Sequence, residues 1–260
     1  GLELFDKYKI TAYPTLLFLD AKGKEIDRSV DLDEAAPLAA EMKSIAEGRS
    51  PLAELTKKAD KEKDNLQLWF EVGSRWAFKA EKAQAEKYLQ KVLTVDKDNA
   101  KGLASKAVFI LGKFLYLRGL KKYDSAAIQL EQLKKYFPTS PEAKGINVTL
   151  ASAYLKDKRE GQAVKLLRKA IEQNPNEATP YAEFAVFAWK NNYKLDEGFE
   201  KAQKATGLNP KDPDLWDIQA EVQFAQNKPS DAVKSEEEAV KLKADEPYYK
   251  QQIERFKKGK

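Results

Sequence analysis

Apolar and polar residues alternate with two different periods along the first thirty residues. Leu2 to Ile10 carries apolar side chains at nearly helical spacing, which predicts a short helix. Thr15 to Asp20 is a short apolar run that predicts a buried strand, and Glu25 to Val30 alternates as a second strand does. Gly23 lies in the turn between them, where a positive φ is needed. The two strands are therefore expected to form a β-hairpin.

A helix is predicted after the hairpin. Asp31 to Asp33 supplies N-cap side chains for a helix from about Glu34 to Ala46. Leu38, Met42 and Ile45 form a single apolar stripe along it. Glu47 to Ser50 is expected to end this helix.

Only helical periodicity remains from Ser50 onward. Ser50 as N-cap and Pro51 at the first helical position begin a series of amphipathic helices of about 12 to 16 residues. Prolines recur in the breaks between these helices at positions 138, 175 and 210, at intervals of 37 and 35 residues. A regular period of this size predicts a helical repeat architecture.

The unit from Lys144 to Glu177 shows the repeat most clearly. Its large, small and aromatic positions are Leu150, Ala151, Tyr154, Ala163, Leu167 and Ala170. Small residues let two helices approach closely, large ones fill the gap to the next pair, and Pro175 prevents the second helix from continuing. The unit resembles a tetratricopeptide repeat (TPR), which is a helix-turn-helix pair.

Counting outward at the same period gives five such units over about residues 64 to 245. The matching positions of the other four units are Trp69, Gly73, Trp76, Ala85, Leu89; Leu111, Gly112, Ala126, Leu130, Leu133, Pro138; Tyr181, Ala185, Ala205, Pro210; and Trp216, Ala220, Ala232, Ala239. The second unit has about two extra residues in its inter-helix turn near Gly119, and the fourth has Gly198 where alanine is usual. Pro247 to Lys258 is predicted to be a capping helix. The resemblance implies a mainly α fold, a right-handed TPR-type α-solenoid of about five helix pairs with a cap.

The resemblance also implies where binding residues lie. In a TPR solenoid the first helices of successive pairs line a concave surface. In-register counting assigns to this surface Gln67, Phe70, Ser74, Phe78, Phe109, Lys113, Tyr116, Ser152, Lys156, Lys190, Asp217 and Glu221. The surface runs from aromatic to acidic, so a partner segment with apolar anchors at one end and basic residues at the other would be complementary. A packing surface for a neighbouring domain or subunit is the alternative. The signature aromatics Trp69, Trp76, Tyr154 and Trp216 are expected to pack between helices instead.

TPR domains that hold chaperone C-termini use a clamp of lysine and asparagine on this face. That set is absent at the matching positions, so binding of chaperone tails is disfavoured.

The stretch "AYPTLLFLDAKGKEIDRSV" resembles the C-terminal half of a thioredoxin-like domain, which adds a small N-terminal α/β fragment to the fold. The resemblance implies that Pro14 is cis and that Tyr13, Pro14 and Thr15 form a cis-Pro loop beside a reactive cysteine pair. The implied domains are a thioredoxin-like half at residues 1–48, a connecting helix at 49–63, and the TPR solenoid at 64–260.

The amino-acid composition excludes several kinds of catalytic site. The chain contains no cysteine and no histidine, so it lacks thiolate nucleophiles and the commonest metal ligand and general base. Its 46 basic and 41 acidic residues are interspersed, which argues against nucleic-acid binding. No apolar run approaches the length of a membrane span. Paired aspartates in the inter-repeat turns, such as Asp96 and Asp98, are interpreted as helix caps rather than calcium ligands. We expect no cofactor and no metal.

These observations favour a protein-protein interaction module that binds a peptide or protein partner on its concave face. The alternative is the substrate-recruiting part of a thiol-disulfide oxidoreductase whose Cys-X-X-Cys half lies upstream. This chain alone is not expected to be an enzyme. The sequence begins at Gly1, and it is either part of a longer protein or a degenerate half-domain joined to the repeats. A homodimer through the hairpin and a periplasmic or other extracytoplasmic bacterial location are further expectations.

Overall fold

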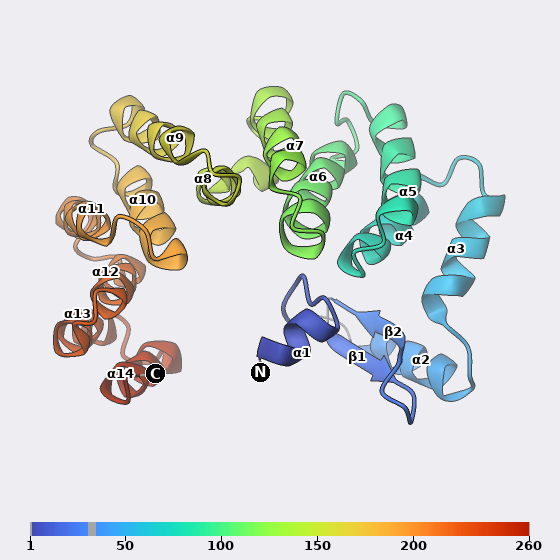
Figure 1. The fold of residues 1–260 in the computed structure, drawn as a ribbon, viewed down its shortest axis with the longest axis horizontal. Helices are drawn as coiled ribbons and strands as arrows, with labels where there is room; N and C mark the ends of the chain where they lie inside the picture. The colour runs from blue at the N-terminus through green and yellow to red at the C-terminus, as the bar shows by residue number, and fades with distance from the viewer. Residues whose placement is uncertain (1, 31–34, 260) are drawn as a thin grey trace. The chain divides into compact units, whose positions relative to one another are not determined.

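The computed structural model describes residues 2–30 and 35–259 (Figure 1). The chain forms two compact units that divide between Ile146 and Asn147. We call them the N-terminal unit and the C-terminal unit and describe each by itself.

The N-terminal unit begins with the predicted helix and hairpin. Helix α1 (Leu2–Lys7) is followed by β1 (Leu16–Leu19) and β2 (Glu25–Ser29), which pair antiparallel with Leu16 opposite Ser29. Gly23 has a φ of 74°, as the turn requires. The Tyr13–Pro14 peptide bond is cis. Helix α2 (Ala35–Ala46) follows, and its predicted N-cap residues 31–33 lie outside the described residues.

Helical repeats make up the rest of the N-terminal unit. Helix α3 (Pro51–Lys61) begins at the predicted cap, where Ser50 Oγ accepts a hydrogen bond of 3.3 Å from the Ala53 amide. The helices that follow are α4 (Leu66–Phe78), α5 (Lys82–Val95), α6 (Leu103–Phe109), the π-helix η1 (Ile110–Gly119), α7 (Tyr123–Tyr136) and the 3-10 helix η2 (Pro141–Ala143). Helix α4 packs against α5, and η1 packs against α7. These are the first two predicted pairs.

The second repeat departs from the prediction in one respect. Its extra residues do not lengthen the turn near Gly119; they are taken up within the first helix, which continues from α6 as η1. The Leu120 amide donates to the Leu115 carbonyl, five residues earlier, at 2.8 Å. A π-helix turn holds more residues than an α-helix turn, so it absorbs an insertion without breaking the helix.

The C-terminal unit contains the other three predicted pairs and the cap. Its helices are α8 (Ile146–Lys156), α9 (Glu160–Gln173), α10 (Ala178–Asn191), α11 (Leu195–Leu208), α12 (Pro213–Ala225), α13 (Pro229–Leu242) and α14 (Pro247–Lys257). Helix α10 packs against α11, α12 against α13, and α14 against α13. The boundaries agree with the predicted repeat phase.

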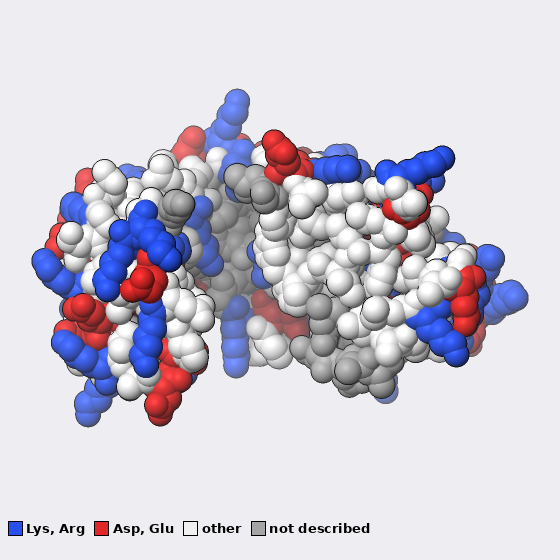
Figure 2. All heavy atoms as spheres, turned by 90° about the horizontal axis from the view of Figure 1, so that it is seen from below, with Lys and Arg blue, Asp and Glu red and all other residues white. Residues whose placement is uncertain are grey.

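Charged side chains of both signs are mixed on the face that Figure 2 shows. On the face shown in Figure 2, lysine and arginine side chains lie among aspartate and glutamate side chains, and the right-hand part shows a broad uncharged area. Exposed large hydrophobic side chains in the N-terminal unit include Leu4, Leu19, Ile26 and Met42, with exposed fractions of 59%, 41%, 38% and 50%. The hairpin region therefore presents apolar side chains to solvent.

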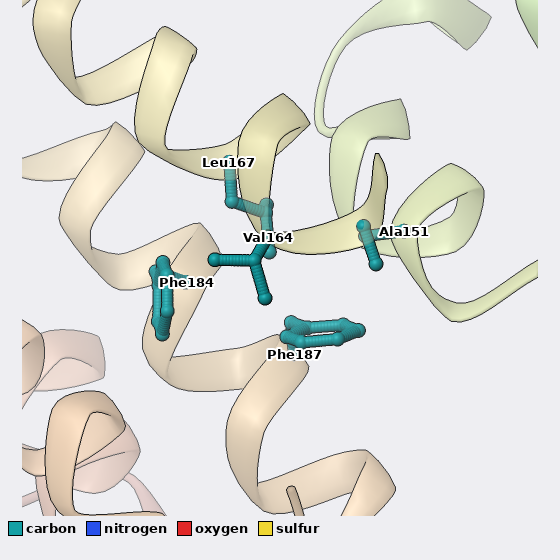
Figure 3. Close-up of a cluster of buried hydrophobic side chains, with 6 residues drawn as sticks. Ala151, Val164, Leu167, Phe184 and Phe187 are labelled. Carbon is teal, nitrogen blue, oxygen red and sulfur yellow. The ribbon is translucent and has the colours of Figure 1, made fainter. Parts of the chain in front are cut away.

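Within the C-terminal unit, the core lies between the helices of neighbouring pairs. Figure 3 shows Ala151 of α8, Val164 and Leu167 of α9, and Phe184 and Phe187 of α10 in contact within one buried cluster. Small residues at the seams allow this approach. A Cβ atom on Gly198 of α11 would lie 2.4 Å from the Cβ of Ala188 on α10, so glycine is required there. The described chain is a TPR-like helical repeat protein.

The signature tryptophans of the first repeat pack against α3. Trp69 is 5% exposed, and its indole Nε1 donates to the carbonyls of Ala59 and Glu62. Trp76 Nε1 donates to Thr56 Oγ1 at 3.0 Å. Both side chains hold the connecting helix to the repeats, as expected of structural residues. Asp96 is also a cap, since its carboxylate accepts from the amides of residues 101, 103 and 104.

Candidate functional site

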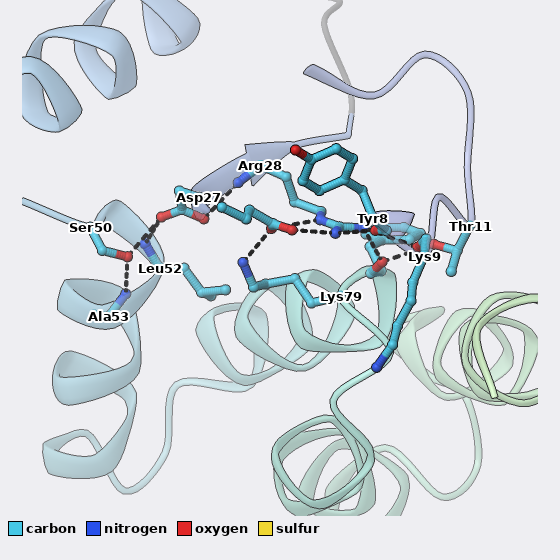
Figure 4. A network of polar contacts seen from close by, with 11 residues as sticks. Tyr8, Lys9, Thr11, Asp27, Arg28, Ser50, Leu52, Ala53 and Lys79 are labelled. Atoms are coloured by element: carbon cyan, nitrogen blue, oxygen red, sulfur yellow. Dashed lines mark hydrogen bonds and ion pairs between the residues drawn. The ribbon is translucent and has the colours of Figure 1, made fainter. Parts of the chain in front are cut away.

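A buried arginine joins the hairpin to the repeats. Arg28 on β2 is 5% exposed, and its guanidinium donates to the carbonyls of Tyr8 and Lys9 at 2.6 and 3.2 Å (Figure 4). It also donates at 2.9 Å to the carbonyl of Phe78, the last residue of α4. A cation at a helix C-terminus interacts favourably with the helix dipole. Glu25 accepts two further bonds from this guanidinium, at 2.9 and 2.6 Å, and balances its charge. All three guanidinium nitrogens therefore have partners.

The neighbouring aspartate makes the matching contact at a helix N-terminus. Asp27 Oδ2 accepts from Ser50 Oγ at 2.8 Å and from the Leu52 amide at 3.1 Å, at the start of α3. An anion is stabilised there by the helix dipole. Both charged side chains, Asp27 and Arg28, are thus buried at helix ends, Asp27 at the start of α3 and Arg28 at the end of α4.

The docked hairpin and the repeats enclose a cleft of about 880 Å³. Its walls are the loop around Pro14, the end of β2, helix α4 and helix η1. The lining residues are Ala12, Tyr13, Pro14, Arg28, Ser29, Val30, Gln67, Phe70, Glu71, Ser74, Arg75, Phe78, Ile110, Lys113, Phe114 and Arg118. A cleft of this size accommodates several residues of an extended peptide.

Aromatic rings form one wall of the cleft. Phe114 of η1 makes edge contacts with Phe78 of α4, at a centroid distance of 5.1 Å, and with Phe109, at 5.7 Å. The Lys113 ammonium lies 5.2 Å from the Phe114 ring centroid, and the Arg118 guanidinium carbon lies 5.4 Å from it. Arg118 is also held by a bond of 2.9 Å to the Thr11 carbonyl. The cationic groups of Lys113 and Arg118 therefore lie against the aromatic wall of the cleft.

The other wall carries polar groups of α4. Arg75 pairs with Glu41 of α2, and its Nε lies 3.5 Å from Glu71 Oε1. The remaining nitrogen, Arg75 Nη1, is buried and has no hydrogen-bond partner among the described residues. Ser74 is 6% exposed, and its hydroxyl oxygen is likewise buried without a partner in the described part of the chain. Both unsatisfied groups belong to side chains that line the cleft.

The cleft brings together several residues that the sequence assigned to different sites. Gln67, Phe70, Ser74, Phe78 and Lys113 lie there with Tyr13 and Pro14 of the cis-Pro loop. Thr15 supports this loop, since its hydroxyl donates to the Ala12 carbonyl at 2.7 Å. Phe109 contacts Phe114 but does not itself line the cleft. Tyr116 is 8% exposed and donates to Glu86 of α5, so it lies between helices and outside the lining of the cleft.

The predicted binding residues of the C-terminal unit lie elsewhere. Ser152 accepts a bond of 2.9 Å from Asn191 Nδ2 and joins α8 to α10, while Lys156 and Lys190 are exposed. Glu221 is 6% exposed and pairs with Arg255 of α14 at 2.6 Å. Tyr249 of α14 donates to Asp214 at 2.6 Å. The chain's own capping helix therefore contacts the acidic end of the predicted surface.

Burial raises the pKa of two acidic side chains near the capping helix. Burial, together with the neighbouring charges of Glu221 and Asp214, raises the pKa of Asp217 to about 6. Glu236 of α13 has no exposed surface, and burial raises its pKa to about 8, with further contributions from Asp217 and Glu221. These carboxyl groups lie inside a helix interface, and the described residues hold no cluster suited to a metal ion.

Sequence reasoning missed part of the cleft. The positions not foreseen include Arg28, Arg75, Ile110, Phe114 and Arg118. Helical counting placed Tyr116 on the inner face, whereas Phe114 and Arg118 of the same helix line the cleft. The excess of basic and aromatic residues between positions 109 and 118 was the available signal.

Comparison with known proteins gives partial matches. The family model YfiO, described as an outer membrane lipoprotein, matches residues 115–215. No curated protein matches the chain significantly. No helix among the described residues has the length and apolar character needed to cross a membrane.

Several solved structures resemble the chain at low identity. MamA from Desulfovibrio magneticus RS-1 is 18% identical, with 70% of this chain and 96% of that chain covered and a TM-score of 0.42. YrrB, a TPR protein with an unusual peptide-binding site, is 17% identical over 77% and 97%, with a TM-score of 0.39. TTC0263, a thermophilic TPR protein of Thermus thermophilus, is 15% identical over 74% and 98%, with a TM-score of 0.48. At these values the assignment of a TPR-like fold depends on the helix pairs of the chain itself.

Proposed function

We propose that this chain is a protein-interaction module that holds an extended segment of a partner protein in the cleft between the cis-Pro loop and helices α4 and η1. The observation that carries the proposal is the composition of the cleft. It combines an aromatic wall with polar groups that have no partner within the described chain. Binding sites typically combine apolar area, which supplies affinity, with a few fixed polar groups, which supply orientation.

The cleft also has a rigid frame. Arg28 and Asp27 connect the hairpin to the end of α4 and the start of α3 through buried bonds. Little order has to be created on binding when the site is already formed, so more of the contact energy appears as affinity. Phe70, Phe78 and Phe114 are the proposed anchors.

Selection of peptides tests this proposal. Random dodecapeptides displayed on phage would be selected on the immobilised chain, and the affinities of the selected peptides measured for the wild type and two variants. Phe70→Glu places a charge in the cleft, whereas Tyr136→Glu changes an aromatic residue that is 61% exposed and lies outside it. We expect at least a tenfold loss of affinity for Phe70→Glu and little change for Tyr136→Glu. Equal affinities, or the recovery of no binding peptide, would refute the proposal.

A second candidate is the recruiting part of a thiol-disulfide oxidoreductase. The order α1, β1, β2, α2 is the one that the thioredoxin-like resemblance implies, and it supports assigning residues 1–48 to such a half-domain. The chain has no cysteine, so the dithiol would belong to another part of the protein. The gene sequence upstream decides this candidate: a Trp-Cys-X-X-Cys motif about 40 to 60 residues earlier supports it, and its absence rejects it.

Self-association through the hairpin is a structural alternative. Leu4, Leu19 and Ile26 are exposed, and an open sheet edge can pair with another strand. Light scattering over a range of concentrations tests this, because a monomer throughout would remove it. We also propose an extracytoplasmic location, which the partial match to the YfiO model supports.

A further inference from the structure

We propose that the cleft selects a peptide segment in which a carboxylate lies two residues from an aromatic side chain. This inference rests on the proposed function and names the chemistry of the partner. It follows from three features: the unsatisfied donors, the balance of charge in the lining, and the spacing of side chains along α4.

The unsatisfied groups call for a hydrogen-bond acceptor. Arg75 Nη1 can only donate, and the Ser74 hydroxyl can donate as well as accept. A buried donor without a partner costs about 1–3 kcal/mol, so a ligand that satisfies both donors gains correspondingly. A carboxylate oxygen is a strong acceptor for a guanidinium.

The charge of the lining favours the same chemistry. Four lining side chains are basic (Arg28, Arg75, Lys113 and Arg118), and Glu71 is the one acidic side chain among the lining residues described above. Glu25 balances the charge of Arg28, and Glu41 pairs with Arg75. Arg118 instead donates to a neutral group, the Thr11 carbonyl, so its charge contributes to the attraction of an anion. The carboxylate of Glu71 already lies near Arg75. A peptide bearing negative charge is therefore attracted to the cleft, and a basic peptide is repelled.

The spacing along α4 defines the pattern of the ligand. Phe70, Ser74 and Phe78 are four residues apart, and all three line the cleft. Four residues of α-helix rise by about 6 Å. Side chains on one face of an extended peptide are two residues apart, or about 6.6 Å. An extended peptide along α4 therefore places an aromatic side chain, a carboxylate and a second aromatic side chain at alternate positions, opposite these three residues.

Synthetic peptides test the inference directly. The probe is a fluorescein-labelled, C-amidated peptide with the core Phe-Gly-Asp-Gly-Phe, and the comparison peptides carry Asn or Lys in place of Asp. Fluorescence anisotropy with the complete chain gives each Kd. We expect the Asp peptide to bind at least tenfold more tightly than the Asn peptide, and the Lys peptide to bind most weakly. A peptide that ends in a free carboxylate two residues after Phe distinguishes a C-terminal carboxylate from an acidic side chain.

Matched variants test whether the preference for Asp over Asn arises in the cleft. Lys113→Glu reverses one charge in the cleft, and Lys190→Glu makes the same change at an exposed position outside it. Ser74→Ala removes a donor with little change in volume. We expect Lys113→Glu and Ser74→Ala to reduce the advantage of Asp over Asn, and Lys190→Glu to leave it unchanged.

The outcomes separate this inference from the function on which it rests. If the Lys peptide binds most tightly and Phe70→Glu abolishes its binding, the ligand chemistry is wrong and the cleft remains a peptide site. If the Asp peptide has no advantage over the Asn peptide, or no peptide of this set binds, the inference is overturned. The selection of phage-displayed peptides then tests the proposed function independently of this inference.

Discussion

Single residues at the helix seams control how closely the repeats pack. Gly198→Ala would introduce a Cβ atom 2.4 Å from the Cβ of Ala188, and neither atom can move without its backbone. We expect a loss of about 1–3 kcal/mol in the free energy of unfolding. Gly207→Ala on the same helix is the matched control, because its Cβ would meet no atom within 4 Å. There alanine should stabilise the helix by about 0.5–1 kcal/mol. Urea unfolding of both variants measures the difference, and similar effects at the two sites would contradict the account.

The buried Glu236 predicts a dependence of stability on pH. Its pKa is about 8 in the folded chain, against 4.5 for an ordinary glutamate. The folded state therefore binds the proton more strongly than the unfolded state, and stability falls as the pH rises from about 4.5 to about 8. The titratable and charged groups that interact with this side chain across the helix interfaces are Asp217, Glu221, Tyr248, Tyr249 and Arg255.

Glu236→Gln removes the ionisation and should raise the free energy of unfolding at pH 9 by a few kcal/mol, on the order expected for a buried carboxyl group. At pH 4.5 and below its effect should be small. Urea unfolding at both pH values measures this, with Glu237→Gln as the control at an exposed position of the same helix. A gain that is the same at both pH values would contradict the predicted ionisation.

At the scale of elements, the hairpin depends on one guanidinium for its position. Arg28→Lys keeps the charge but cannot reach Glu25 and the three backbone carbonyls at once. We expect faster hydrogen exchange in β1 and β2, while α4 and α5 keep their protection. Arg49→Lys, at an arginine with a half-exposed side chain, is the control. Unchanged exchange in Arg28→Lys would show that other contacts hold the hairpin.

The elements also show what sequence patterns could and could not predict. The helix pairs were predictable because Pro138, Pro175 and Pro210 recur at intervals of 37 and 35 residues, and such a period constrains every unit at once. The π-helix was not, because an inserted residue looks the same in a helix as in a turn. The docking of the hairpin was missed because Asp27 and Arg28 have the polarity of solvent-exposed residues, yet their partners are helix ends distant in sequence.

At the scale of the whole molecule, the candidate site depends on elements that the sequence treated as separate. Sequence counting placed Phe70 and Phe78 on an inner face and Tyr13 and Pro14 in a redox-type loop. The structure places all four around one cleft within the N-terminal unit. The proposed activity therefore depends on that unit, and charge reversal at Lys190 in the C-terminal unit should not affect it.

The central claim is that a partner peptide occupies this cleft, and the absence of cysteine allows a direct measurement. Gln67→Cys and Lys190→Cys each introduce a single thiol that can be labelled with an environment-sensitive dye, since the chain has no other. Gln67 is exposed and lines the cleft, whereas Lys190 is exposed and does not belong to the lining. On titration with a selected peptide, we expect the dye at position 67 to change its emission with the Kd found by anisotropy, and the dye at position 190 to remain unchanged. A change at position 190 with none at position 67 would contradict the account.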